Sequence, residues 1–153
     1  MLEISDHIKK LRNELDNKDF DIQKFDNDLN LLFKMESPNI IIPLLSLFRD
    51  GFEYSEALFS VVHLIESYDN ETYVRELISG LPELEGASKR WLGIVVHRLV
   101  NNEACYLCFL KLAQTTSDTK ILSALHAAVD QLKLDFKTNN GDRLANDLRY
   151  VTN

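Results

Sequence analysis

Residues 55–68 read SEALFSVVHLIESY, and this stretch shows most clearly which fold the chain adopts. Its apolar residues recur at steps of three and four, the spacing that places them on one face of a helix. The residues of that face are Leu58, Val61, Val62, Ile65 and Tyr68. Because an apolar face of this width must pack against other elements, we expect it to be buried within a larger helical array.

The same periodicity extends outward over nearly all of the 153 residues. It predicts helices over residues 4–17, 20–33, 40–49, 55–68, 72–79, 88–100, 103–113 and 120–134, and a short one after Gly141. Polar residues suited to N-caps stand before several of them: Ser37, Asp69 or Asn70, Asn102, and Ser117 or Asp118. Gly51 and Gly80 are expected to end helices, and residues 81–86 to form a connector.

No segment alternates between apolar and polar residues with a period of two, so we expect no sheet. Pairs of helices begin near residues 40, 71 and 103, about 32 residues apart. This spacing predicts a single all-α domain over residues 1–153, built as a HEAT-like α-solenoid. An irregular helical bundle of about nine helices is the alternative.

The composition indicates a cytoplasmic protein. The two cysteines, Cys105 and Cys108, cannot form the disulfide framework of a small secreted domain. The charged N-terminal segment lacks the apolar run of a signal peptide. No apolar stretch approaches the roughly 20 residues of a membrane helix, so no membrane association is expected.

Charge is concentrated in one part of the chain. Residues 37–86 carry nine acidic residues but only Arg49 and Arg75 as bases, whereas the whole chain has a net charge of −7. Nucleic acid is therefore not expected as a direct partner, because phosphate binding needs clustered Lys and Arg. The acidic segment instead favours a basic protein as partner.

Aromatic residues are interleaved with these acids near the expected helix ends. An aromatic ring can anchor a protein partner while carboxylates steer a basic one toward it. The alternative is that acids such as Glu56 and Glu71 only stabilise helix N-termini. The candidate partner-binding residues are Glu53, Tyr54, Glu56, Tyr68, Asp69, Glu71, Tyr73, Glu83 and Glu85.

No motif in the chain predicts catalysis, a cofactor or a metal. A nucleophile elbow, a glycine-rich phosphate loop and paired zinc ligands are all missing from the sequence. His63 and Glu66 share a helix face, and His97 lies on a neighbouring expected helix, so a metal site there is an alternative. We expect instead that His63 is partly buried and hydrogen-bonded to Glu66 or to backbone, and that Glu66 pairs with Arg98. The two cysteines are expected in the core.

Scattered positions of the chain resemble the immunity protein 30 family. The resemblance covers about residues 40–112 and rests on residues 61–68 (VVHLIESY), Tyr73-Val74, Leu81-Pro82, Trp91 and residues 98–101 (RLVN). The family contains small bacterial helical proteins, among them immunity proteins of contact-dependent growth inhibition and related polymorphic toxin systems.

The resemblance implies a non-enzymatic inhibitor in the cytosol that binds the toxic C-terminal domain of an effector. Many such toxins are nucleases, which must present basic surface to RNA or DNA. An acidic inhibitor suits a partner of this kind. A helical scaffold or adaptor that binds some other protein is the alternative function.

Overall fold

The computed structural model describes residues 3–152, with side chains as far as residue 149, so residues 1–2 and 153 of the expected domain lie outside it. Within that range the chain forms nine α-helices and one 3₁₀ turn and has no strand, which confirms the all-α class. The elements are α1 (Ile4–Leu15), α2 (Ile22–Phe33), η1 (Pro38–Ile40), α3 (Ile41–Leu45), α4 (Ser55–Glu66), α5 (Asn70–Ala87), α6 (Lys89–Val100), α7 (Glu103–Ala113), α8 (Thr119–Asp135) and α9 (Asn140–Thr152).

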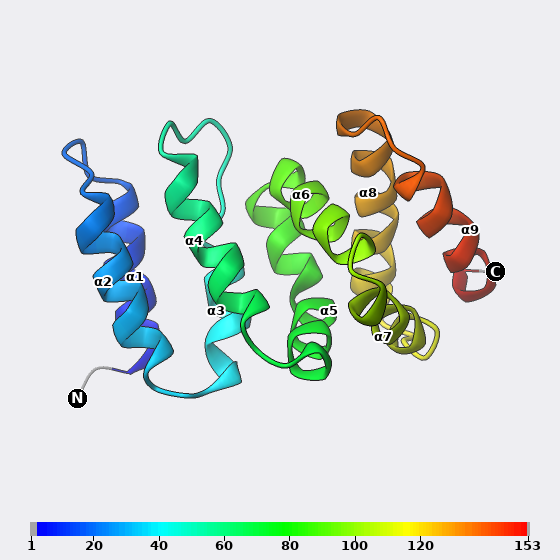
Figure 1. The fold of residues 1–153 in the computed structure, drawn as a ribbon, viewed down its shortest axis with the longest axis horizontal. Coiled ribbons are helices and arrows are strands. Elements are labelled where there is room, and N and C mark those ends of the chain that lie inside the picture. The colour runs from blue at the N-terminus through cyan, green and yellow to red at the C-terminus, as the bar shows by residue number, and fades with distance from the viewer. Residues whose placement is uncertain (1–2, 153) are drawn as a thin grey trace.

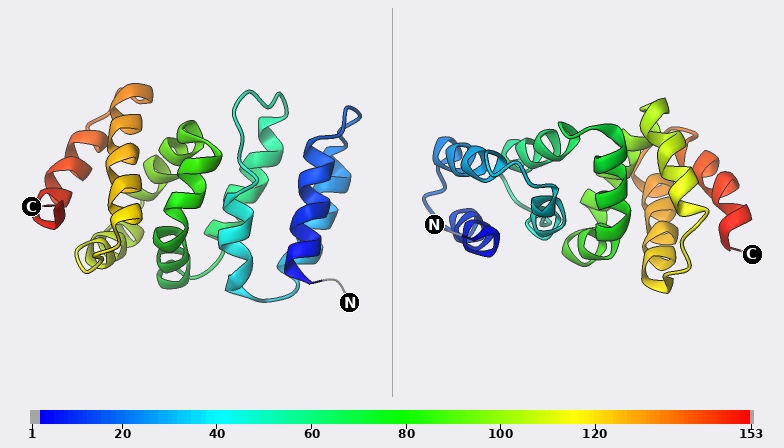
Figure 2. Two further views of the ribbon diagram at one scale, coloured as in Figure 1. Left: turned by 180° about the vertical axis from the view of Figure 1, so that it is seen from behind. Right: turned by 90° about the horizontal axis from the view of Figure 1, so that it is seen from below.

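The helices follow one another along an elongated row in the order of the sequence (Figure 1). The two views of Figure 2 show α1 and α3 in one layer and α2 and α4 in another. Contacts join each helix mainly to its near neighbours in the chain, such as α1 to α3, α2 to α4, α3 to α5, and α6 to α8. The helix pairs α3/α4, α5/α6 and α7/α8 begin at Ile41, Asn70 and Glu103, close to the expected positions. A specific HEAT repeat remains a prediction.

One continuous apolar core runs along this row. The expected face of α4 is buried, and α6 places Trp91 against the rings of Phe48 and Phe59 at centroid distances of 5.1 and 4.9 Å. Most of α6 is buried, because apolar residues occupy nearly all of its faces. The row therefore holds its shape by burying apolar side chains between successive helices.

The polar residues expected to cap helices do so. Asp69 accepts a hydrogen bond from the Thr72 backbone N–H, and Asn102 accepts one from that of Cys105. Asp118 likewise caps α8, whereas Asp21, which the sequence analysis missed, caps α2. These caps satisfy backbone donors that a helix N-terminus leaves free. They fix where four of the helices begin.

Helix α3 is shorter than expected. It ends at Leu45 rather than Arg49, because the Ser46 hydroxyl donates to the Pro43 carbonyl at 2.6 Å and the next backbone bonds tighten to i→i+3 spacing. Gly51 does adopt the left-handed conformation, with φ of 70°, but in the loop beyond. The loop between α3 and α4 is consequently long enough to reach neighbouring turns of the row.

The expected connector over residues 81–86 is wrong. Helix α5 continues through Gly80 and Pro82 to Ala87. Proline inside a helix costs about 3 kcal/mol, but full burial of Leu81 and Leu84 returns about 1.5–3 kcal/mol each. Gly80 is buried where α5 meets α3, and a Cβ there would lie 2.6 Å from Leu45 Cδ1. It permits close packing rather than ending the helix.

None of the helices in the described part of the chain has both the length and the apolar character that a membrane span requires.

Candidate functional site

The residues expected to bind a partner are divided between the two ends of α4. Glu53, Tyr54 and Glu56 lie at its N-terminus, whereas Tyr68 and Asp69 follow its C-terminus. With 12 residues in the helix, the two groups are about 18 Å apart. The partner-binding residues expected from the sequence therefore lie on two separate edges of the row, the upper and the lower in Figure 1.

The upper edge gathers most of the expected acidic residues. The Ser88 hydroxyl donates to Asp50 at 2.6 Å, which joins the loop before α4 to the junction between α5 and α6. The end of α5 contributes two further acids to this edge. We define the acidic edge as Asp50, Glu53, Tyr54, Glu56, Glu83 and Glu85. Within the described residues, none of its four glutamates takes part in an ion pair.

Aromatic rings from two loops pack together beside the acidic edge. Phe20, from the turn between α1 and α2, lies 5.3 Å from Phe52 and 5.1 Å from Tyr54, measured between ring centroids. Arg49 forms an ion pair with Asp16 of the same turn. The sequence analysis missed Phe20 because it stands 34 positions before Tyr54, and only tertiary structure brings the two turns together.

The residues at the lower edge already have structural partners. The Tyr68 hydroxyl donates to the Ser37 carbonyl at 3.1 Å, so it ties the end of α4 to η1. The backbone and side chain of Thr72 donate to Asp69 at 3.0 and 2.8 Å, and these hydrogen bonds lower the pKa of Asp69. Glu71 is exposed on the first turn of α5. These contacts account for Tyr68 and Asp69 without a partner protein.

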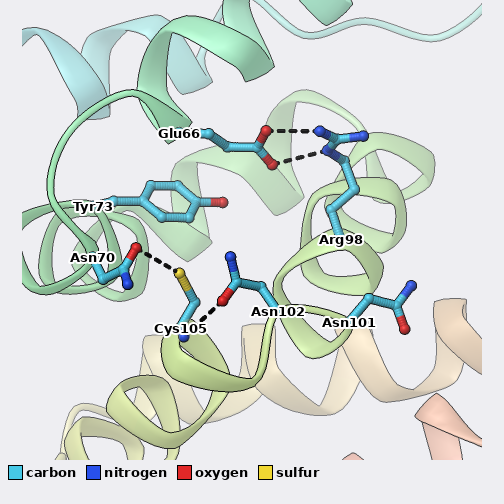
Figure 3. Close-up of a pocket in the computed structure, with 7 residues that line it drawn as sticks. All are labelled: Glu66, Asn70, Tyr73, Arg98, Asn101, Asn102 and Cys105. Atoms are coloured by element: carbon cyan, nitrogen blue, oxygen red, sulfur yellow. Dashed lines mark hydrogen bonds and ion pairs between the residues drawn. The ribbon is translucent and has the colours of Figure 1, made fainter.

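Tyr73 is not at the surface as a partner-binding residue should be. Only 3% of it is exposed, because it lies on the face of α5 that packs into the core. The prediction that the Tyr73 side chain contacts a partner at the surface is therefore wrong for its ring. Its hydroxyl, however, is directed into a pocket at the lower edge of the row (Figure 3).

This pocket lies where α4, α5, α6 and α7 meet, and we call it the central pocket. Its volume is about 450 Å³. Four helix ends form it, so backbone turns and polar side chains make up most of its wall. The lining residues are Glu66, Asn70, Tyr73, Arg98, Asn101, Asn102 and Cys105.

A bidentate ion pair forms one wall of the central pocket. Arg98 donates from Nε and Nη2 to the two carboxylate oxygens of Glu66, each at 2.8 Å, which confirms the expected pairing. The fork of the guanidinium matches the carboxylate, and such charge-assisted pairs are stronger than neutral hydrogen bonds. The pair joins α4 to α6 across the pocket and leaves this wall without net charge.

The Tyr73 hydroxyl is the unusual group in the central pocket. It is buried and, within the described residues, forms no hydrogen bond. Burial, and then the negative charge of Glu66, raise the pKa of Tyr73, so the phenol stays protonated and can donate. A buried polar group without a partner is costly, and few remain in folded proteins.

Cys105 and two asparagines complete the wall. The Cys105 thiol donates to Asn70 at 3.2 Å, and burial raises the pKa of the thiol, which disfavours the reactive thiolate. Cys105 is buried as expected, whereas Cys108 is only partly so. Asn102 caps α7, and this contact fixes the orientation of the Asn102 side-chain amide. Its Oδ1 accepts from the Cys105 backbone N–H, so Nδ2 is the end of the amide without a partner in the described residues.

The residues of the alternative metal site do not converge. His97 stacks on Phe136 at a centroid distance of 3.9 Å, and its ring nitrogens approach the amides of Asn101 and Asn140. His63 is exposed on α4, so the expectation that it is partly buried is wrong. Among the described residues, no three His, Cys, Asp or Glu side chains are grouped to hold a metal ion.

A buried pair of carboxyl groups, Glu14 and Asp28, lies at the N-terminal end of the row, between α1 and α2. Burial, and then the neighbouring Asp28, raise the pKa of Glu14 to about 7. Lys10 approaches Asp28 at 3.2 Å, and Lys24 approaches Glu14 at 3.7 Å. The contribution of this pair to the packing of α1 on α2 therefore depends on pH. The pair lies apart from the central pocket.

Comparison with known proteins identifies a family. Residues 9–109 match the family model described as Immunity protein 30, and this range is more than half of the 153 residues. It includes every residue of the central pocket and of the acidic edge. No curated protein and no solved structure matches the chain.

Proposed function

Because the chain belongs to the immunity protein 30 family, we propose that it neutralises the toxin of a contact-dependent growth inhibition system by covering the toxic C-terminal domain. The family is one of polymorphic toxin immunity proteins, which bind a cognate toxin. The match to the family model over residues 9–109 is the main observation that supports this proposal. Inhibition of this kind needs a stable complex and no catalytic group, and it takes place in the cytoplasm of the protected cell.

We further propose that the toxin is a basic nuclease domain and that the acidic edge contacts it. The net charge of −7 favours approach of a basic protein, and the free carboxylates of Glu53, Glu56, Glu83 and Glu85 concentrate this charge at one edge. Oppositely charged surfaces raise the association rate of two proteins. The packed rings of Phe20, Phe52 and Tyr54 provide an apolar anchor beside them.

Co-expression tests the function directly. A toxin domain encoded beside the gene for this chain should stop growth when expressed alone, and co-expression of the chain should restore growth. The pair should also copurify in equal amounts. If the chain bound a protein that is not toxic, the adaptor function would replace the proposed one.

A charge-reversal pair tests the acidic edge. The double variant Glu53→Lys with Glu83→Lys should lower the association rate constant with the toxin domain by about tenfold at low salt. The matched control, Glu36→Lys with Asp130→Lys, changes two exposed acids outside the acidic edge by the same net charge. Equal association rates for the two double variants would exclude the acidic edge as the contact surface. Thermal unfolding should be similar for both.

A further inference from the structure

The central pocket contains more hydrogen-bond donors than its own acceptors satisfy. Within the described residues, the Tyr73 hydroxyl is buried without a hydrogen-bond partner. Arg98 Nη1 and Asn102 Nδ2 are two further donors that have no protein partner in that range. The hydroxyl is the decisive group, because it is buried without a partner, whereas the other two donors belong to side chains that are at least partly exposed to solvent. A buried hydroxyl without an acceptor favours a ligand that brings an acceptor oxygen into the pocket.

The charge of the central pocket limits which classes of ligand it can bind. Glu66 and Arg98 neutralise each other, so no net positive charge is left to hold a carboxylate or phosphate. A cationic group would place further donors against the Tyr73 and Asn102 donors. A primary amide suits both sets of groups: its oxygen can accept from Tyr73 and Asn102, and its NH₂ can donate to the remaining lone pairs of Glu66.

We infer that the central pocket binds an uncharged side-chain amide, from an Asn or Gln of the toxin, with the Tyr73 hydroxyl as a donor to its oxygen. This inference rests on the proposed function for the identity of the partner. The pocket volume of about 450 Å³ is ample for one side chain. A standard interface covers about 800 Å² on each partner, a patch roughly 30 Å across. One toxin domain can therefore reach both this pocket and the acidic edge, about 18 Å away along α4.

The variant Tyr73→Phe tests the inference, because it removes the hydroxyl and keeps the ring. Affinity for the toxin domain, measured by calorimetry, should fall about 3- to 10-fold, the range expected for one hydrogen bond. The melting temperature should stay the same or rise, since the hydroxyl has no partner in the free protein. Unchanged affinity would overturn the inference, whatever the melting temperature.

Tyr106→Phe is the matched control. Tyr106 is also buried, but its hydroxyl donates to Asp147 at 2.5 Å, outside the central pocket. This variant should lower the melting temperature and leave toxin affinity unchanged. An affinity loss equal to that of Tyr73→Phe would mean that any buried tyrosine hydroxyl has this effect, which would also overturn the inference.

A small probe separates the chemistry of the pocket from the identity of the partner. Acetamide, titrated against the isotope-labelled protein, should shift the side-chain amide signals of Asn70 and Asn102 in a saturable way, and Tyr73→Phe should abolish saturation. Acetate and methylammonium should give no saturable shift. If the protein binds no toxin but acetamide binds as described, the proposed function fails while the assigned chemistry of the pocket stands. If acetate or methylammonium saturates instead, the assignment of an amide is wrong.

Discussion

The variant Gly80→Ala examines the packing that places α5, and with it Tyr73, in the row. In an open helix position this change stabilises a protein by about 1 kcal/mol, because alanine is the better helix former. At position 80 the new Cβ would lie 2.6 Å from Leu45 Cδ1 and 3.1 Å from Ile42 Cγ1. Carbon atoms pack best at about 3.5–4.0 Å, so Leu45 or the whole of α3 must move by about 1 Å.

Leu45 is completely buried, so this movement disturbs the core. Overpacking of this kind costs about 1–3 kcal/mol. After subtraction of the gain in helix propensity, the net loss is about 1 kcal/mol and at most about 2 kcal/mol. For a chain of this length, 1 kcal/mol corresponds to a fall in melting temperature of about 2–4 °C.

Gly86→Ala provides the comparison on the same helix. No atom lies within 4 Å of a Cβ at this position, and the glycine is exposed. Alanine should therefore raise stability by about 0.5–1 kcal/mol. Thermal and urea unfolding of the two variants measure both effects. The decisive result is their order: if Gly80→Ala proves as stable as Gly86→Ala, then α5 and α3 are not in the close contact described above.

Two further predictions concern ionisable groups. Because the pKa of Glu14 is raised to about 7 from 4.5, the folded state holds this proton more tightly, and stability should fall as pH rises from about 4.5 to 7. Glu14→Gln should flatten that part of a plot of unfolding free energy against pH, and a slope equal to that of the unchanged protein would contradict the assigned pKa. Arg98→Lys cannot form the bidentate pair with Glu66 and should lower the melting temperature by about 2–4 °C, or about 1 kcal/mol. Scanning calorimetry measures this shift, and its absence would show that the pair contributes nothing to stability.

The helices and their starting points were predictable because the signals are local. The three-to-four spacing of apolar residues and the capping side chains of Asp69 and Asn102 act within one or two turns. The expected pair of Glu66 and Arg98 was also correct, although it joins α4 to α6, with α5 between them in the chain. Where local signals conflicted with packing, packing prevailed, as in the continuation of α5 through Gly80 and Pro82.

The candidate site was less predictable, because it depends on which turns lie beside one another. Glu53 and Tyr68 belong to one acidic segment of the sequence but lie at opposite ends of α4. Phe20 joins Tyr54 across two turns, and Tyr73 lies in the core with its hydroxyl in the central pocket. No spacing along the chain encodes these relations.

The sequence by itself determined the class of fold, the helix starts and the excess of acidic groups between residues 37 and 86, because periodicity, capping and composition are properties of the chain alone. The tertiary structure decided which of those groups share an edge and which polar atoms are enclosed together. The physical reason is that burial and proximity arise only when the helices pack, and the unpaired hydroxyl of Tyr73 is a consequence of that packing.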